Sequence, residues 1–263
     1  YCGASPVFID SEKKSWNICP GLLEAELRRS ASKGQLPKAV IVVHVFGQSA
    51  DMEPIMRICK EFEVPVIEDA AESLGATYGD FHTGTIGDFG VYSFNGNKIM
   101  TTSGGGMLVG HDENAIAKAR YLSTQARDPV VHYEHREIGY NYRLSNILAA
   151  IGRAQLSSMP EKVAARRKIF NRYVSGLSDF PGLSFMPEAE YGLSNRWLSI
   201  INIDSNKFGL TLEALRKELE SDNIESRPVW KPMHLQPLYK QCEYFNLGED
   251  ISAKIFKNSI HTI

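Results

Sequence analysis

Two short apolar runs of the sequence each end in polar residues that could do chemistry. Residues 64–67 lead into Glu68 and Asp69, and residues 90–94 lead toward Lys98. A short apolar run bounded by turn residues is typical of a buried parallel strand. Ligands of open α/β sheets bind just beyond the carboxyl ends of such strands. Asp69 and Lys98 are therefore predicted at one ligand-binding edge of a sheet.

The residue types at this edge suit one kind of cofactor. A desolvated lysine such as Lys98 can act as an amine nucleophile, and the small residues 101–106 after it permit close approach of the backbone to a ligand. Ser93 and Asn95, just before the lysine, could donate hydrogen bonds to a phosphate. Asp69 could pair with a pyridinium nitrogen. A lysine and a carboxylate presented in this way are the protein groups that pyridoxal phosphate needs.

These residues also have purely structural interpretations. Lys98 could be a solvated surface lysine, and Asp69 could cap the segment that follows it. Glu68 should point to the opposite face of its strand from Asp69 and is expected to be structural.

The strands and helices predicted around these residues are typical of an α/β fold. Residues 39–46 predict a buried strand and residues 52–62 a helix with Asp51 as its N-cap, so that the strand at 64–67 completes a parallel βαβ unit. Further strands are expected at 6–10, 90–94, 106–109 and 197–203. Further helices are expected at 21–32, 113–123, 144–156, 161–177 and 212–222, the last with Thr211 as its N-cap. Residues 75–87 and 124–139 are expected to be irregular.

Composition excludes several classes of protein. The chain has 263 residues, 43% of them hydrophobic and 23% charged, with a formal net charge of −2, so it is neither disordered nor equipped to bind nucleic acid or an anionic membrane. No apolar stretch is long enough to span a bilayer, and we expect no signal peptide. The four cysteines lack metal-ligand spacing, which argues against a metal site and makes the cytoplasm the simplest location.

Motifs along the chain resemble one family. The run 66–76 (VIEDAAESLGA), Gly87-Asp88, Ser93-Phe94, Asn97-Lys98 and the glycines 104–106 are similar to the signature of the DegT/DnrJ/EryC1/StrS nucleotide-sugar aminotransferases. Residues 139–156 resemble a second motif of that family, and residues 233–237 resemble a third. The matches occur in order from about residue 6 to residue 240.

The resemblance implies a role for each matching residue. Lys98 would carry pyridoxal 5'-phosphate covalently, Asp69 would pair with its ring nitrogen, and Ser93 would hold its phosphate. Glu72 occupies the position near the cofactor's ring hydroxyl, where the family often has Gln or His. Asn141 and Arg143 would reach the phosphate in the neighbouring subunit of a homodimer with shared active sites. His234, and Asn95 beside the lysine, would lie near the sugar nucleotide.

The resemblance also implies the architecture. It predicts the fold of aspartate aminotransferase, with a large cofactor-binding domain over residues 1–158 that has a mostly parallel mixed sheet flanked by helices. A smaller C-terminal α/β domain would occupy residues 159–263. The family's phosphate-cradling turn and ring-stacking residue lie upstream of the strand at 6–10. We therefore expect an N-terminal part, and also a C-terminal end, to lie outside this sequence.

The activity implied is transfer of an amino group, with glutamate as the expected donor, to the C4 ketone of a nucleotide-linked 4-keto-6-deoxy sugar. Residues 195–197 (NRW) and 227–234 (RPVWKPMH) are most similar to the branch acting on UDP-linked N-acetylhexosamines, of the bacillosamine or legionaminic-acid type. Some relatives have histidine in place of the lysine and dehydrate their substrate, so Lys98 favours transamination. Three alternatives remain: a 3-keto sugar, a dTDP or GDP handle, and a non-catalytic sensor that keeps the fold. A Rossmann oxidoreductase is disfavoured because its Gly-rich turn must follow the first strand, whereas Gly104–Gly106 come much later in the chain and open a strand.

Overall fold

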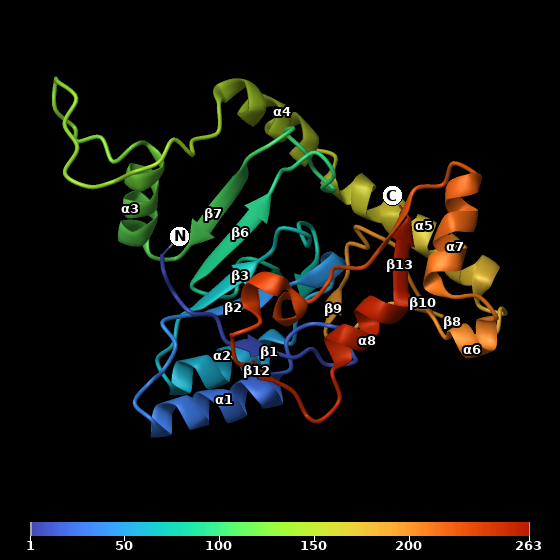
Figure 1. Cartoon of the computed structure of the whole chain (residues 1–263). Helices are drawn as coiled ribbons and strands as arrows, with labels where there is room; N and C mark the ends of the chain where they lie inside the picture. The colour runs from blue at the N-terminus through green and yellow to red at the C-terminus, as the bar shows by residue number, and fades with distance from the viewer. Residues whose placement is uncertain (1, 263) are drawn as a thin grey trace.

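The computed structural model describes residues 2–262 and is built around a four-stranded sheet (Figure 1). The strand order is β2 (Val40–Val43), β3 (Val66–Asp69), β6 (Phe89–Ser93) and β7 (Gly106–Gly110). The first three strands are parallel, and β7 is antiparallel to β6. The predicted mostly parallel mixed sheet is thus present, with β2, α2 and β3 as the predicted βαβ unit.

One face of this sheet is covered by α1 (Pro20–Ser32) and α2 (Met52–Glu61). The residues of β2 alternate between buried and exposed, with Val40 and Val42 in a core that also contains Leu27 and Ile55. Because successive side chains of a strand point to opposite faces, Asp69 lies on the other face. The register places it between Val43 of β2 and Val91 of β6.

A second sheet is made by the C-terminal part of the chain. Its antiparallel order is β11 (Ser226–Pro228), β13 (Ser259–Thr262), β10 (Ile200–Ile203) and β8 (Leu183–Phe185). The helices of this part are α5 (Met159–Leu177), α6 (Ser205–Phe208), α7 (Leu212–Ser221) and α8 (Ile251–Asn258). Helices α3 (Glu113–Ser123) and α4 (Asn146–Leu156) flank a long connection that projects from the body in Figure 1.

Short elements join distant parts of the chain. β1 (Phe8–Ile9) pairs in parallel with β12 (Tyr244–Phe245), and β4 (Thr77–Tyr78) pairs with both β5 (Phe81–His82) and β9 (Gly192–Leu193). The remaining elements are the 3₁₀ turns η1 (Val45–Gly47), η2 (Met233–Leu235) and η3 (Pro237–Tyr239).

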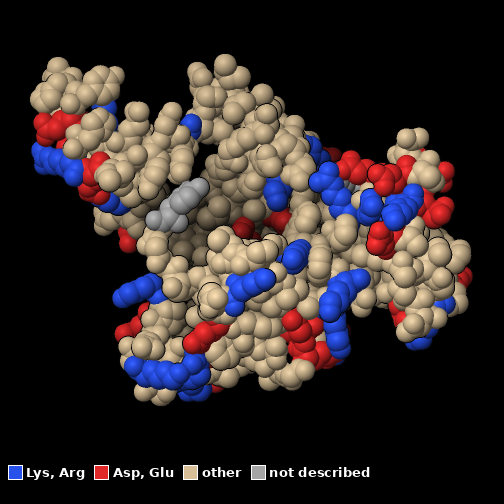
Figure 2. Space-filling model, viewed as in Figure 1, with Lys and Arg blue, Asp and Glu red and all other residues tan. Residues whose placement is uncertain are grey.

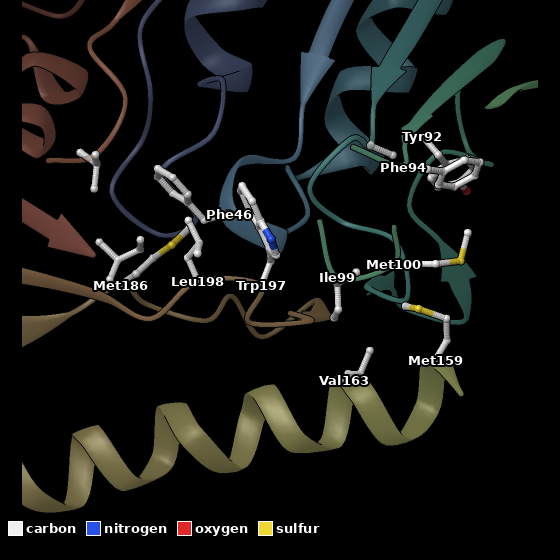
Figure 3. Close-up of a cluster of buried hydrophobic side chains, with 13 residues drawn as sticks. Phe46, Tyr92, Phe94, Ile99, Met100, Met159, Val163, Met186, Trp197 and Leu198 are labelled. Atoms are coloured by element: carbon white, nitrogen blue, oxygen red, sulfur yellow. The ribbon is translucent and has the colours of Figure 1, made fainter. Parts of the chain in front are cut away.

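A shared hydrophobic core connects the two sheets. Phe94 and Ile99, from the segment after β6, lie in the same buried cluster as Met159 and Val163 of α5 and Trp197 (Figure 3). Burial of large apolar side chains is the main favourable term in folding. The cluster therefore holds the segment that carries Lys98 against the C-terminal part of the chain.

Several sequence predictions of local structure need correction. The strand predicted at 39–46 ends at Val43, because Phe46 adopts a positive φ of 54° within η1. Asp51 precedes α2, but its side chain makes no capping hydrogen bond and instead accepts one from Tyr78 Oη at 2.8 Å. The strand predicted from residue 197 begins at Ile200. Residues 75–87, expected to be irregular, include β4 and β5, whereas Thr211 does cap α7 by accepting from the Ala214 amide.

Candidate active site

The Lys98 amine lies between a carboxylate and an aromatic ring. The turn after β6 closes with a hydrogen bond from the Lys98 amide to the Asn95 carbonyl, 3.1 Å. Lys98 Nζ is 3.7 Å from Glu72 Oε1 and 4.3 Å from the centroid of the Trp197 ring. The Lys98 and Glu72 side chains are each 14% exposed, so Lys98 is not the solvated surface lysine of the plainer interpretation.

Both oxygens of Glu72 are held by hydrogen bonds. The Phe46 amide donates to Oε2 at 2.7 Å, and Trp230 Nε1 donates to Oε1 at 3.0 Å. Burial raises the pKa of Glu72 above its ordinary value, although the Phe46 amide, the Lys98 ammonium and the Trp230 indole act in the opposite direction. The carboxylate is thus fixed in place and carries a charge at a cost in desolvation.

Asp69 and Ser93 lie on neighbouring strands of the sheet. Asp69 ends β3, and its Oδ1 accepts from the Ala71 amide at 3.1 Å. The predicted capping role is therefore present, and Oδ2 has no hydrogen bond to any of residues 2–262. Ser93 ends β6, where its Oγ is 3.4 Å from the Asn95 amide, and the Asn95 side chain is exposed.

Glu68 points to the opposite face, as predicted, and is structural. It is fully buried, and it accepts hydrogen bonds from His44 Nε2 at 2.8 Å and from the amides of Gly84, Ile86 and Gly87 at 2.6–2.7 Å. Burial alone would raise the pKa of Glu68, but the hydrogen bonds from His44 and the glycine amides outweigh it and hold the pKa below its ordinary value. Glu68 thereby fixes β3 next to Asp69.

The surface of the molecule has a hollow. Figure 2 shows the surface recessed between the elements at its top and those below, with acidic and basic side chains at the bottom of the recess. Three aromatic rings gather beside Glu72. Trp230 packs against Phe46 at 5.4 Å and against Trp197 at 6.3 Å between ring centroids.

Three predicted site residues are not part of this cluster. Asn141 and Arg143 are exposed, on the connection between α3 and α4. His234 lies in η2, where Nε2 is 2.9 Å from Asp250 Oδ2 and its ring stacks on Tyr244 at 3.7 Å. The structure therefore brings together Lys98, Glu72, Asp69 and Ser93. Asn95 is exposed in the turn before Lys98, and Asn141, Arg143 and His234 lie elsewhere in this chain.

Sequence reasoning missed the aromatic residues of the site. Phe46, Trp197 and Trp230 come from segments far from Lys98 in sequence, and only the fold brings them to Glu72. The available signal is the tryptophans of the runs 195–197 and 227–234, which by sequence alone indicate only the substrate class.

The residues present fit pyridoxal phosphate. A shielded lysine amine can bond to its aldehyde carbon, a carboxylate with an open oxygen (Asp69 Oδ2) suits its ring nitrogen, and Ser93 one strand away offers a hydroxyl for its phosphate. A mixed sheet that presents Lys98 and the Asp69 carboxylate at one edge is typical of the class of pyridoxal phosphate enzymes.

Comparisons with known proteins indicate the same class of enzyme. The profile of the DegT/DnrJ/EryC1/StrS aminotransferase family matches residues 1–261. The chain is 52% identical over 262 residues to "Putative pyridoxal phosphate-dependent aminotransferase EpsN" of Bacillus subtilis, covering 99% of this chain and 67% of the relative. It is 38% identical over 240 residues to GDP-perosamine synthase of Caulobacter vibrioides, covering 91% and 63%.

A solved structure shows the same fold. A DegT DnrJ EryC1 StrS aminotransferase from Brucella abortus superposes with a TM-score of 0.88 at 28% identity, covering 99% of this chain and 68% of that one. The chain belongs to the DegT/DnrJ/EryC1/StrS aminotransferase family. This membership confirms the predicted family, fold type, enzyme class and cofactor, pyridoxal 5'-phosphate.

The chain spans about two thirds or less of the length of these curated relatives. Among residues 2–262, no helix is long and apolar enough to cross a membrane, and no group of three or more His, Cys, Asp or Glu side chains is arranged to hold a metal ion.

Proposed function

We propose that this chain forms the larger part of an aminotransferase that moves an amino group from an amino acid to the C4 ketone of a nucleotide-linked 4-keto-6-deoxy sugar. The observation that carries the proposal is the Lys98 amine held 3.7 Å from Glu72, on the sheet edge where Asp69 and Ser93 end neighbouring strands. Glutamate is the expected amino donor.

Each group has a task in this reaction. Pyridoxal phosphate, when bound, supplies the electron sink that stabilises negative charge on the carbon losing its proton. Asp69 would accept a hydrogen bond from the protonated ring nitrogen, and Ser93 would donate one to the phosphate. Lys98 would hold the cofactor covalently between turnovers. Its free Nζ would move a proton from the donor carbon to the cofactor in the first half of the reaction, and from the cofactor to the sugar carbon in the second half. Glu72 offsets the positive charge on Lys98 while the lysine holds that proton.

The nucleotide is the finer part of the proposal. The motifs at 195–197 and 227–234 favour a UDP-linked N-acetylhexosamine, whereas the name of the Caulobacter relative favours a GDP-linked sugar for that protein. Assays of the full-length protein with glutamate and a panel of UDP-, GDP- and dTDP-linked 4-keto and 3-keto sugars separate these substrates. Preference for the GDP sugar would overturn the UDP assignment and leave the aminotransferase standing.

The assembly and the location are also proposals. We infer a homodimer in which Asn141 and Arg143 reach the partner's cofactor phosphate, because both side chains are exposed and outside the Lys98 cluster. A cytoplasmic location suits the four cysteines, which are all free thiols. His234 is proposed near the sugar nucleotide, with Asp250 fixing its ring.

An absorption spectrum tests the core of the proposal. The full-length protein with pyridoxal phosphate should show the visible band of the lysine-bound cofactor, and borohydride should abolish it. Lys98→Ala should lack the band. A wild-type protein without the band would overturn the assignment of Lys98, and a band without transamination of any sugar would favour the non-catalytic alternative.

A further inference from the structure

One turn of the C-terminal part holds both sides of the lysine site. Asn195 Nδ2 donates to the Glu72 carbonyl at 2.9 Å and to the Leu74 carbonyl at 3.0 Å. Two residues later, Trp197 Nε1 donates to the Asn97 carbonyl at 2.8 Å, directly before Lys98 in the chain. Residues 195–197 thus fix the backbone of Glu72 and the backbone of Lys98 relative to each other.

The Trp197 ring has little freedom to move. The residue is 1% exposed, and its backbone amide donates to Asn195 Oδ1 at 2.8 Å. Its ring packs in the cluster of Figure 3 beside Phe46 and Ile99. A ring fixed in this way presents a permanent π face to whatever lies over it.

What lies over this face is the Lys98 ammonium, at 4.3 Å from the ring centroid. Tryptophan binds cations best among the aromatic side chains, and the attraction is stronger when the pair is shielded from water. The charged groups near the amine are Glu72, at 3.7 Å, and Asp69, whose charge acts on Glu72. The free amine is therefore held near both a π face and a carboxylate.

We propose that Trp197 is a positioning residue for Lys98, and that its fixed indole face holds the free amine beside Glu72 while the lysine carries no cofactor. This inference rests on the proposed role of Lys98. The amine must stay in reach of the reacting carbon after the donor has displaced it, and the ring prevents it from swinging away. Trp197 itself acts only through Lys98.

Residue-specific labelling of the full-length protein without cofactor tests the inference. Trace acetylation with acetic anhydride, read peptide by peptide by mass spectrometry, reports how freely each lysine amine reacts. In Trp197→Leu we expect Lys98 to react roughly three- to tenfold faster than in the wild type, while the other lysines keep their rates, because the leucine offers no π face. Trp197→Phe keeps a ring, so its increase should be smaller.

A matched control separates positioning from packing. Ile200 of β10 is fully buried in the same core cluster and, being aliphatic, offers no π face to Lys98, so Ile200→Ala should lower the melting temperature without changing the Lys98 rate. Unchanged Lys98 labelling in Trp197→Leu, or an equal rise in Ile200→Ala, would overturn the proposal. If Trp197→Leu does not fold, Trp197→Phe decides, with about a twofold rise expected and no rise overturning it. Because the measurement needs no cofactor and no turnover, a failed transamination assay leaves its result independent.

Discussion

The family resemblance predicts an amide or an imidazole where this chain has the carboxylate of Glu72. This carboxylate brings a buried negative charge within 3.7 Å of the Lys98 amine, and the amide of Phe46 and the indole of Trp230 fix its direction. A neutral Gln could keep one of these hydrogen bonds but could not balance an ammonium. The carboxylate is therefore suited to an amine that must repeatedly gain and lose a proton.

The pH dependence of turnover should report this carboxylate. Because burial raises the pKa of Glu72, the group becomes neutral as the pH falls while still above 4.5, the ordinary value, and Lys98 then loses its counter-charge. We expect kcat of the full-length protein to fall on the acid side with a midpoint above pH 4.5. In Glu72→Gln this acid limb should be absent and kcat should be about tenfold lower throughout. An acid limb that persists unchanged in Glu72→Gln would assign it to another group.

Glu68, one residue before Asp69, makes a different prediction, about stability. Its pKa is held below the ordinary 4.5, so its contribution is fully present above that pH and is lost as the pH falls through the lowered value. Urea unfolding should show Glu68→Gln less stable than the wild type by about 3 kcal/mol at pH 7, because the amide cannot satisfy four buried donors. The difference should shrink below pH 4.5. The exposed Glu213→Gln should show only the small effect of losing a solvated ion pair with Lys217.

At the scale of residues, sequence reasoning could predict where a side chain lies when the position depends on local structure. The positions of Asp69 at the end of β3 and of Lys98 after β6 could be predicted because each follows an apolar run, and the direction of Glu68 because side chains alternate along a strand. The roles of Asp69 and Lys98 stay predictions. Trp197 and Trp230 could not, since their contacts with Lys98 and Glu72 span about a hundred residues or more and leave no periodicity in one sequence.

At the scale of elements, η1 is the piece on which the site depends most. It ends β2 early, turns the Phe46 amide toward Glu72, and brings Gly47 against Asn195, whose amide donates to the Gly47 carbonyl at 3.1 Å. Gly47 has φ +89°, and a Cβ there would lie 1.7 Å from Asn195 Oδ1. Only glycine fits both the backbone and the neighbour.

A single methyl group should therefore disturb both stability and the site. We expect Gly47→Ala to lower the free energy of unfolding by about 2–4 kcal/mol and to weaken cofactor binding, because Asn195 must move off the Glu72 carbonyl. Chemical denaturation and titration with pyridoxal phosphate measure the two effects. Gly34→Ala is the matched control: Gly34 also has a positive φ, of 66°, but nothing lies within 4 Å of its Cβ position. Equal losses in both variants would reduce the effect to backbone strain alone.

The boundaries of elements show where local patterns stop being informative. Helices with clear caps, such as α7 after Thr211, begin where the sequence predicts. The apolar run at 39–46 predicts a longer strand than β2, because Val45 and Phe46 are apolar for a reason other than a strand: they pack in the core that joins the two sheets. Asp51 has the residue type of an N-cap, yet its carboxylate accepts a hydrogen bond from the Tyr78 hydroxyl instead of from the helix.

At the scale of the whole molecule, two sheets divide the chain much as the predicted boundary at residue 158 does. The boundary falls between α4 and α5, and each side has its own four-stranded sheet. The division stays a prediction, and the candidate site contains residues from both sides of it. Trp197 and Trp230 come from the C-terminal side, and Lys98 and Glu72 come from the N-terminal side. Movement of one part relative to the other would therefore change the contacts of the lysine amine and of Glu72.

The shared active site of the proposed homodimer gives the last prediction. If Asn141 serves the cofactor phosphate of the neighbouring subunit, Asn141→Asp and Lys98→Ala should each be nearly inactive, the first because its carboxylate repels the phosphate. Mixed dimers of the two hold one site with both residues intact, so unfolding and refolding an equal mixture should restore about a quarter of the wild-type activity. A mixture of Lys98→Ala with Asp69→Ala should restore none, since those residues lie in one subunit's site. No recovery in the first mixture would place Asn141 outside the partner's site and confine the active site to a single chain.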